Sequence, residues 1–194
     1  MRCANINRKT KETDIKININ LDGEGNTNIN TLVPAFDHML EQIGKHALLD
    51  LNIEAKGDIE IDCHHTVEDV GIALGMALKE ALGDLKGINR YGSAIIPMDE
   101  VLVMCAIDVS NRPYLEMSEI ENIKLGNFDG EMVLEFFRAL SINASINIHI
   151  SVLRGKNMHH IIEGIFKAFA RALLDAISIN PRIKGILSSK GILW

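Results

Sequence analysis

Two short stretches of the sequence each place a pair of adjacent histidines before a glutamate, at one spacing. In both, the glutamate follows the first histidine by four residues. Residues four apart on a helix lie on one face, so this histidine and the glutamate can bind one metal ion together, while the second histidine points about 100° away and is free for another ion. The residues are His64, His65 and Glu68 in the first stretch and His159, His160 and Glu163 in the second.

The ligand types limit which metal ions could bind but do not identify one. Imidazole and carboxylate ligands without thiolate suit Mn, Fe or Zn. The alternative is that these are solvated residues at helix starts, where the helix dipole favours glutamate. That alternative explains one stretch as well as a metal site does, but it is much the weaker explanation for two stretches that match within a repeat.

Three further histidines are available. His38 lies at the start of an expected helix, His46 lies eight residues later on the same face, and His149 lies in the expected strand NIHIS. Each alone is more typical of an ordinary packed or exposed histidine. Beside two incomplete metal sites, His38 and His149 become candidates to complete them, and three histidines with one carboxylate per ion leave room for substrate.

The elements that must position these residues occur twice in the same order. A shift of 95 residues places His159 on His64 and Glu163 on Glu68, and it also matches four apolar positions of the helices that follow. Alternating apolar residues predict strands, and apolar residues at helical spacing predict helices. The expected strands are 15–21, 27–33, 50–58, 91–100, 101–110, 113–117 and 144–152, and the expected helices are 36–49, 66–82, 129–142 and 158–178.

With the Asn-rich alternating segment that opens the chain counted as a strand, each half reads as three strands, a helix, a strand and a helix. We predict a mixed α/β (α+β) fold made by tandem duplication of a βββαβα unit. The first repeat would span residues 1–88 and the second residues 89–194, joined in one compact subunit.

Composition limits the possible partners and setting. Hydrophobic residues make up 47% of the 194 residues and aromatic residues only 5%, so we expect a core of Ile, Leu, Val, Ala and Met. A net charge of −6 argues against a surface that coats nucleic acid. We expect no membrane span and no apolar signal segment. Three cysteines without a C-x-x-C spacing imply no disulfide framework, and the chain reads as cytoplasmic.

Seven motifs in order resemble those of the imidazoleglycerol-phosphate dehydratases of histidine biosynthesis. They are RKTKET, FDHML, DCHHTVEDVGIALGMAL, GINRYGSAIIPMDE, DVSNRPYL, NMHHIIEGIFKAFARAL and SSKGIL, and they span essentially the whole chain. The resemblance implies a tandem fold similar to domain 2 of ribosomal protein S5, with helices on one face of each sheet. It also implies two Mn(II) ions, no organic cofactor, and a homo-oligomer of 24 subunits that forms a shell with active sites between subunits.

The resemblance also implies roles for individual residues. One Mn(II) would take His38, His65, His159 and Glu163, and the other would take His64, Glu68, His149 and His160. The residues implied to act in catalysis are Glu12, Glu68 and Glu163, with Glu12 moving protons. The implied substrate-binding residues are Glu12, His38, His46, His64, His65, Arg90, Arg112, Ser189 and Lys190, of which the two arginines, the serine and the lysine match phosphate-binding positions.

The implied reaction removes water from imidazoleglycerol phosphate to give imidazoleacetol phosphate. The proton that leaves is on a carbon beside the imidazole ring and is barely acidic, so metal ions that stabilise a metal-bound imidazolate would act as Lewis acids. Two alternatives remain. A non-catalytic metal-storage assembly would not need the basic residues, and a two-metal hydrolase would need a metal-activated water aimed at an ester.

Overall fold

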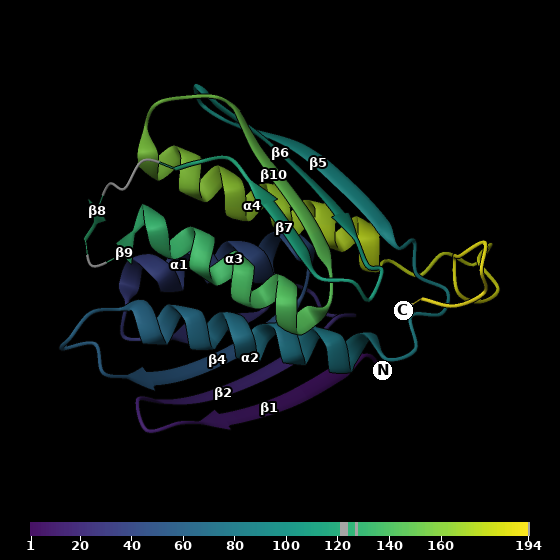
Figure 1. Cartoon of the computed structure of the whole chain (residues 1–194), viewed down its shortest axis with the longest axis horizontal. Helices are drawn as coiled ribbons and strands as arrows, with labels where there is room; N and C mark the ends of the chain where they lie inside the picture. Colours follow the sequence, from purple (N-terminus) through teal and green to yellow (C-terminus); the bar gives the residue numbers. More distant parts are fainter. Residues whose placement is uncertain (121–123, 127, 194) are drawn as a thin grey trace.

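The computed structural model describes residues 1–120, 124–126 and 128–193. Two four-stranded sheets form the outer layers, and the four helices lie between them (Figure 1). Helix α2 packs on the first sheet and against α3, and α4 packs on the second sheet and against α1. Each sheet therefore has helices on one face and leaves its other face outside the helix layers.

The elements follow the predicted order. The first half contains β1 (Cys3–Lys9), β2 (Thr13–Asn20), β3 (Thr27–Asn30), α1 (Pro34–Ala47), β4 (Asp50–Gly57) and α2 (His64–Leu82). The second half contains β5 (Tyr91–Met98), β6 (Val101–Asp108), β7 (Tyr114–Met117), β8 (Lys124–Leu125), β9 (Phe128–Asp129), α3 (Gly130–Ala144), β10 (Asn147–Arg154) and α4 (Met158–Ile177). The mixed α/β fold class is confirmed, with the small β8–β9 hairpin as an addition that the sequence did not predict.

The two sheets share one topology. Their strand orders are β1-β2-β4-β3 and β5-β6-β10-β7. In each, the last pair is parallel and the other pairs are antiparallel. Strand β10 thus occupies in the second sheet the place of β4 in the first. The predicted boundary at residues 88 and 89 stays a prediction.

Strand sequences with a period of two explain which face each sheet turns to the helices. In β2, Ile15, Ile17 and Ile19 are buried beneath the helices, whereas Lys16 between them is exposed. The same alternation in β6 buries Val103 and Cys105. The apolar side chains of the two inner faces and of the helices belong to one hydrophobic core.

Phenylalanines join the helix layers, which the expected aliphatic core did not foresee. All six phenylalanines of the chain are fully buried. Phe36 of α1 lies edge-on to Phe136 of α3, and Phe136 stacks on Phe166 of α4, with ring centroids 5.4 Å apart in both pairs. These contacts fix α1 against α4 close to the positions of His38 and Glu163.

The three cysteines differ in exposure. Cys63 and Cys105 are buried thiols, and Cys3 is an exposed one. Among the described residues, no helix combines the length and the apolar character that crossing a lipid bilayer requires.

Candidate active site

The second histidine pair lies in the first turn of α4. Asn157 caps this helix, because its side-chain oxygen accepts hydrogen bonds from the backbone N–H groups of His159 and His160. One turn later, the Oε2 atom of Glu163 lies 3.2 Å from Nε2 of His159. The helix therefore places this histidine and the carboxylate together, as their spacing predicts.

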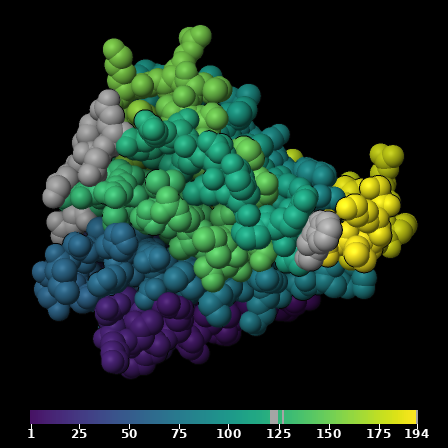
Figure 2. Space-filling view, in the orientation of Figure 1, coloured from purple at the N-terminus to yellow at the C-terminus, as the bar shows by residue number. Residues whose placement is uncertain are grey.

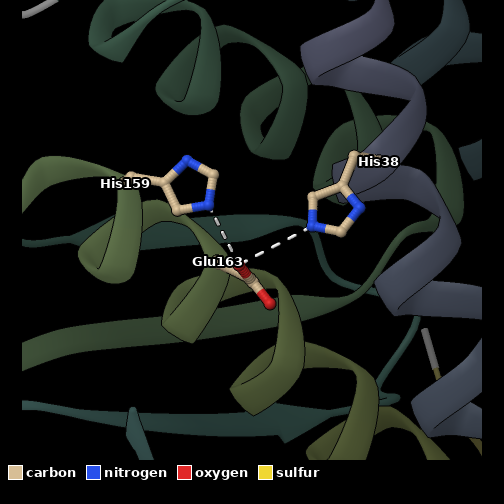
Figure 3. A group of neighbouring side chains, drawn as sticks. All are labelled: His38, His159 and Glu163. Atoms are coloured by element: carbon tan, nitrogen blue, oxygen red, sulfur yellow. Dashed lines mark ion pairs between the residues drawn. The ribbon is translucent and has the colours of Figure 1, made fainter. Parts of the chain in front are cut away.

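His38 reaches the same carboxylate from α1. Its Nε2 atom lies 3.6 Å from Oε2 of Glu163, and its ring stacks parallel to that of His159 with 6.4 Å between centroids. Figure 3 shows the two imidazoles directed at Glu163 from different helices. The three ligand atoms lie within 4.8 Å of one another. Two imidazole nitrogens and a carboxylate oxygen at this separation form a set that can bind a transition-metal ion.

Lys167 holds the other oxygen of Glu163. Its Nζ atom lies 2.7 Å from Oε1, one turn further along α4. Burial raises the pKa of the Glu163 carboxyl, but the hydrogen bond and charge of Lys167, together with the charges of His38 and His159, outweigh burial and leave that pKa below its ordinary value. The carboxylate is thus in its charged form. Lys167 pairs with one oxygen, and the other oxygen is left for the two imidazoles.

The first histidine pair begins α2, and each of its histidines contacts a different carboxylate. His64 Nε2 lies 3.8 Å from Glu68 Oε2, at the predicted spacing of four residues. The His65 ring lies nearly perpendicular to that of His64, and its Nδ1 atom lies 3.0 Å from Asp58 Oδ2 in the loop after β4. This hydrogen bond to Asp58 raises the pKa of His65.

His160 has an equivalent support from a different element. Its Nδ1 atom lies 3.0 Å from Oε2 of Glu100, in the turn between β5 and β6. This contact raises the pKa of His160 and lowers the pKa of Glu100 to about 2. A carboxylate at Nδ1 fixes the ring orientation and leaves Nε2 for a metal ion, as in carboxylate–histidine–metal arrangements.

The remaining expected ligand, His149, lies apart from the others. It is exposed on the outer face of β10, where its ring lies 5.8 Å from that of Tyr114. Within the part of the chain that the structure describes, His38, His159 and Glu163 are the only group of three or more ligands brought together. His65 is therefore separate from the set predicted to include it, and the second predicted set is not gathered within one chain.

The predicted phosphate-binding residues lie just before β5, in the loop before β7 and in the segment after α4. Arg90 donates to both carboxylate oxygens of Asp108 and to the backbone carbonyl of Leu187. It lines a cavity of about 620 Å³ together with Ser189. Lys190 is exposed in this segment, and Arg112 is exposed in the loop before β7.

Two further predicted residues lie on the first half of the chain. His46 is half-buried in the last turn of α1. Burial, with the nearby charges of Lys167 and Arg171, lowers its pKa. Glu12 is exposed in the tight turn between β1 and β2, near enough to His65 that its charge adds to the larger effect of Asp58 on the pKa of that histidine.

A family model described as imidazoleglycerol-phosphate dehydratase matches residues 31–173. The chain belongs to this family. The enzyme from Symbiobacterium thermophilum is 56% identical over 194 residues, covering all of this chain and 93% of that protein. The dehydratase from Acetivibrio thermocellus is 57% identical over 189 residues, covering 97% of each chain.

Solved dehydratase structures share the fold. The crystal structure from Staphylococcus aureus subsp. aureus N315 has a TM-score of 0.83 and 44% sequence identity, covering 92% of this chain and 99% of that one. The structure from Pyrococcus furiosus, in complex with (S)-C348, has a TM-score of 0.83 and 36% identity, covering 97% and 100%. As a member of the imidazoleglycerol-phosphate dehydratases, this chain is a hydro-lyase of histidine biosynthesis.

Three side chains around the dehydratase histidines were missed by sequence reasoning: Asp58, Glu100 and Lys167. The spacing of Glu163 and Lys167 is the four-residue spacing of a helical ion pair and could have been noticed. The two acidic residues carry no such signal, because their contacts depend on how loops fold back onto the starts of α2 and α4.

Proposed function

We propose that the chain converts imidazoleglycerol phosphate to imidazoleacetol phosphate with two Mn(II) ions in each active site. The observation that carries the metal proposal is the convergence of His38, His159 and Glu163. These residues come from two helices, and each directs a nitrogen or an oxygen at the others. Family membership favours dehydration over the storage and hydrolase alternatives.

The donor set fits the proposed ions. One ion would be held by His38, His65, His159 and Glu163, and the other by His64, Glu68, His149 and His160. Hard and borderline nitrogen and oxygen donors without thiolate suit Mn(II). Bound Mn(II) would supply Lewis acidity toward the substrate imidazole. The orientation of Glu163, His65 and His160 would be fixed by their contacts with Lys167, Asp58 and Glu100, respectively.

Other side chains would hold the substrate and move its protons. Arg112, Ser189, Lys190 and Arg90 would bind the phosphate, with charge-assisted hydrogen bonds that align the carbon chain. Arg90 already holds the backbone of Leu187 and thereby keeps the Ser189 segment close. Glu12 would act as the acid or base that transfers the proton, because it is an exposed carboxylate near His65.

We further propose that sites are completed between subunits of a homo-oligomeric shell of 24 copies, working in the cytoplasm. His149 sits on the outer face of the second sheet, and exposed Ile95 and Tyr91 lie on the same face. A second copy that covers this face would bury apolar surface and bring its own ligands to His149. The segment after α4, yellow in Figure 2, projects from the body and could reach a neighbour in the same way.

A metal-exchange experiment tests the proposed function. The protein is stripped with a chelator, dialysed, and assayed on imidazoleglycerol phosphate before and after addition of Mn(II). Turnover should be lost with the metal and return with Mn(II). Full turnover in protein whose metal content is measured at zero would contradict the metal proposal. Absence of turnover with every divalent metal would contradict the reaction.

A further inference from the structure

A buried carboxylate connects the helix of the first histidine pair to the turn that carries Glu12. Asp69 of α2 follows Glu68 directly and is only 8% exposed. Its Oδ2 atom accepts the hydroxyl hydrogen bond of Thr13, the first residue of β2. The same oxygen lies 2.6 Å from Nη1 of Arg8 in β1, a close ion pair without the geometry of a hydrogen bond.

The turn itself is tied by a second threonine. Thr10 Oγ1 accepts hydrogen bonds from the backbone N–H groups of Glu12 and Thr13, at 3.1 and 2.9 Å. The hydroxyl groups of Thr10 and Thr13 also lie 3.1 Å apart, within hydrogen-bond distance. Side chains that bond the backbone two or three residues on fix the path of a tight turn. The backbone of Glu12 is thus fixed through Thr13 to Asp69.

Helix α2 packs so closely on the ends of β2 and β4 that the helix cannot shift along the strands. Gly57, at the end of β4, pairs with Thr13, and a Cβ atom added to it would lie 2.1 Å from Oγ1 of Thr66 in α2. The beginning of α2 therefore rests directly on the strand end. Because Asp69 lies one turn beyond Thr66, a small change at this carboxylate would shift the Glu12 turn relative to His65.

We propose that Asp69 is a positioning residue that sets the carboxylate of Glu12 against the first histidine pair. The inference rests on the proposed role of Glu12 in proton transfer. A purely structural role would require only that the buried charge be paired, which Arg8 alone provides. Instead, the carboxylate also takes the hydroxyl of the residue next to Glu12, so its effect on the reaction should pass through Glu12.

A double-mutant cycle separates positioning from stability. Asp69→Asn keeps the shape but removes the charge, and it should lower kcat by roughly tenfold with KM little changed. Glu12→Gln should lower kcat by roughly 10²-fold. If Asp69 acts through Glu12, the double variant should be no slower than Glu12→Gln alone. Asp14→Asn, which removes an exposed ion pair with Lys9 in the same hairpin, should keep normal kcat.

A conservative pair of variants covers the case in which Asp69→Asn fails to fold. Thr13→Ser keeps the hydroxyl group and should retain kcat, whereas Thr13→Val removes it and should lower kcat, with the metal content of both unchanged. Equal kcat in these two variants would overturn the proposal. So would a loss of kcat by Asp69→Asn that is equally large in the Glu12→Gln background. Normal turnover of Glu12→Gln would instead contradict the proposed role of Glu12.

Discussion

The Nζ atom of Lys167 lies 2.7 Å from Oε1 of Glu163, one turn away on the same helix. The other oxygen, Oε2, faces His159 and His38. The two carboxylate oxygens therefore have separate partners: the ammonium group of Lys167 for Oε1 and two imidazoles for Oε2. A carboxylate held in this way cannot rotate freely. The orientation in which Oε2 would bind a metal ion is therefore set before the ion binds.

Removing the lysine should weaken metal binding. Lys167→Met has a similar length but no charge, and we expect its affinity for Mn(II) to fall by about 10–100-fold. Competition with a metal-sensitive dye measures this without any assay of activity. Lys86→Met, which removes the charge of an exposed ion pair with Asp84, is the control. Equal Mn(II) affinity in the two variants would show that Glu163 needs no support from Lys167.

Two histidines of α1 should behave differently when replaced. His38→Ala removes a nitrogen 3.6 Å from Glu163 and should lose both bound metal and turnover. His46→Ala lies in the last turn of the same helix and should retain its metal, with an effect on substrate affinity alone. Elemental analysis of the purified variants compares them. Full metal content in His38→Ala would remove this residue from the ligand set.

Replacing the two predicted phosphate-binding arginines should have different effects on the segment after α4. Arg112→Ala should weaken substrate binding by about 1.5–3 kcal/mol, the scale of a charge-assisted hydrogen bond, with normal metal content. Arg90→Ala should also loosen residues 182–190, because Arg90 holds the carbonyl of Leu187. Hydrogen exchange of this segment should rise in Arg90→Ala and stay normal in Arg112→Ala. Unchanged substrate affinity in Arg112→Ala would make that residue a surface charge only.

The pair formed by His160 and Glu100 predicts a pH dependence in the metal-free protein. The pKa of His160 is raised above 6.5, so its stabilising contact is complete below pH 6.5 and is lost as pH rises through the raised pKa. The pKa of Glu100 is lowered from 4.5 to about 2, so its contribution is present above pH 4.5 and is lost as pH falls toward 2. The contact is thus complete between pH 4.5 and 6.5.

NMR titration of the metal-free protein checks this directly. His160 should titrate above pH 6.5, and Glu100→Gln should move its midpoint down. His46 should titrate below 6.5 in both proteins, because burial lowers its pKa, with the charges of Lys167 and Arg171 acting in the same direction. A His160 midpoint that does not respond to Glu100→Gln would contradict the prediction.

Metal should also control assembly if ligands from neighbouring subunits share an ion. Metal binding then adds to the free energy of association, and protons compete with the metal for imidazoles. Chelation, or a pH below about 6.5, should release smaller oligomers, and Mn(II) at neutral pH should restore the large particle. Light scattering after size exclusion follows both steps. A large particle that persists at zero metal content would show that packing alone holds the subunits.

The helices and strands could be predicted closely because the apolar residues follow clear periods. The helix expected at 158–178 is observed at Met158–Ile177, and the strand expected at 144–152 is observed at Asn147–Arg154. The β8–β9 hairpin could not be predicted, since two-residue strands are too short to show a period.

The site could be predicted only where its contacts are local. The pairs His159–Glu163 and His64–Glu68 follow from helical geometry alone. The approach of His38 depends on the packing of α1 against α4 through buried phenylalanines, which no spacing in the sequence encodes. Its place at the start of an expected helix made His38 a candidate ligand, and the resemblance assigned it to the set with Glu163, but only the folded chain places it beside that residue.

The second histidines of the two pairs are supported differently in the two halves of the chain. His65 and His160 correspond under the shift of 95 residues, yet they are supported by Asp58 after β4 and by Glu100 between β5 and β6. The shift places Leu153 opposite Asp58 and Asn5 opposite Glu100. The predicted ligand positions thus match under the shift, whereas the supporting acids do not. The halves are therefore not interchangeable at this contact, because each half orients its second histidine from a different loop.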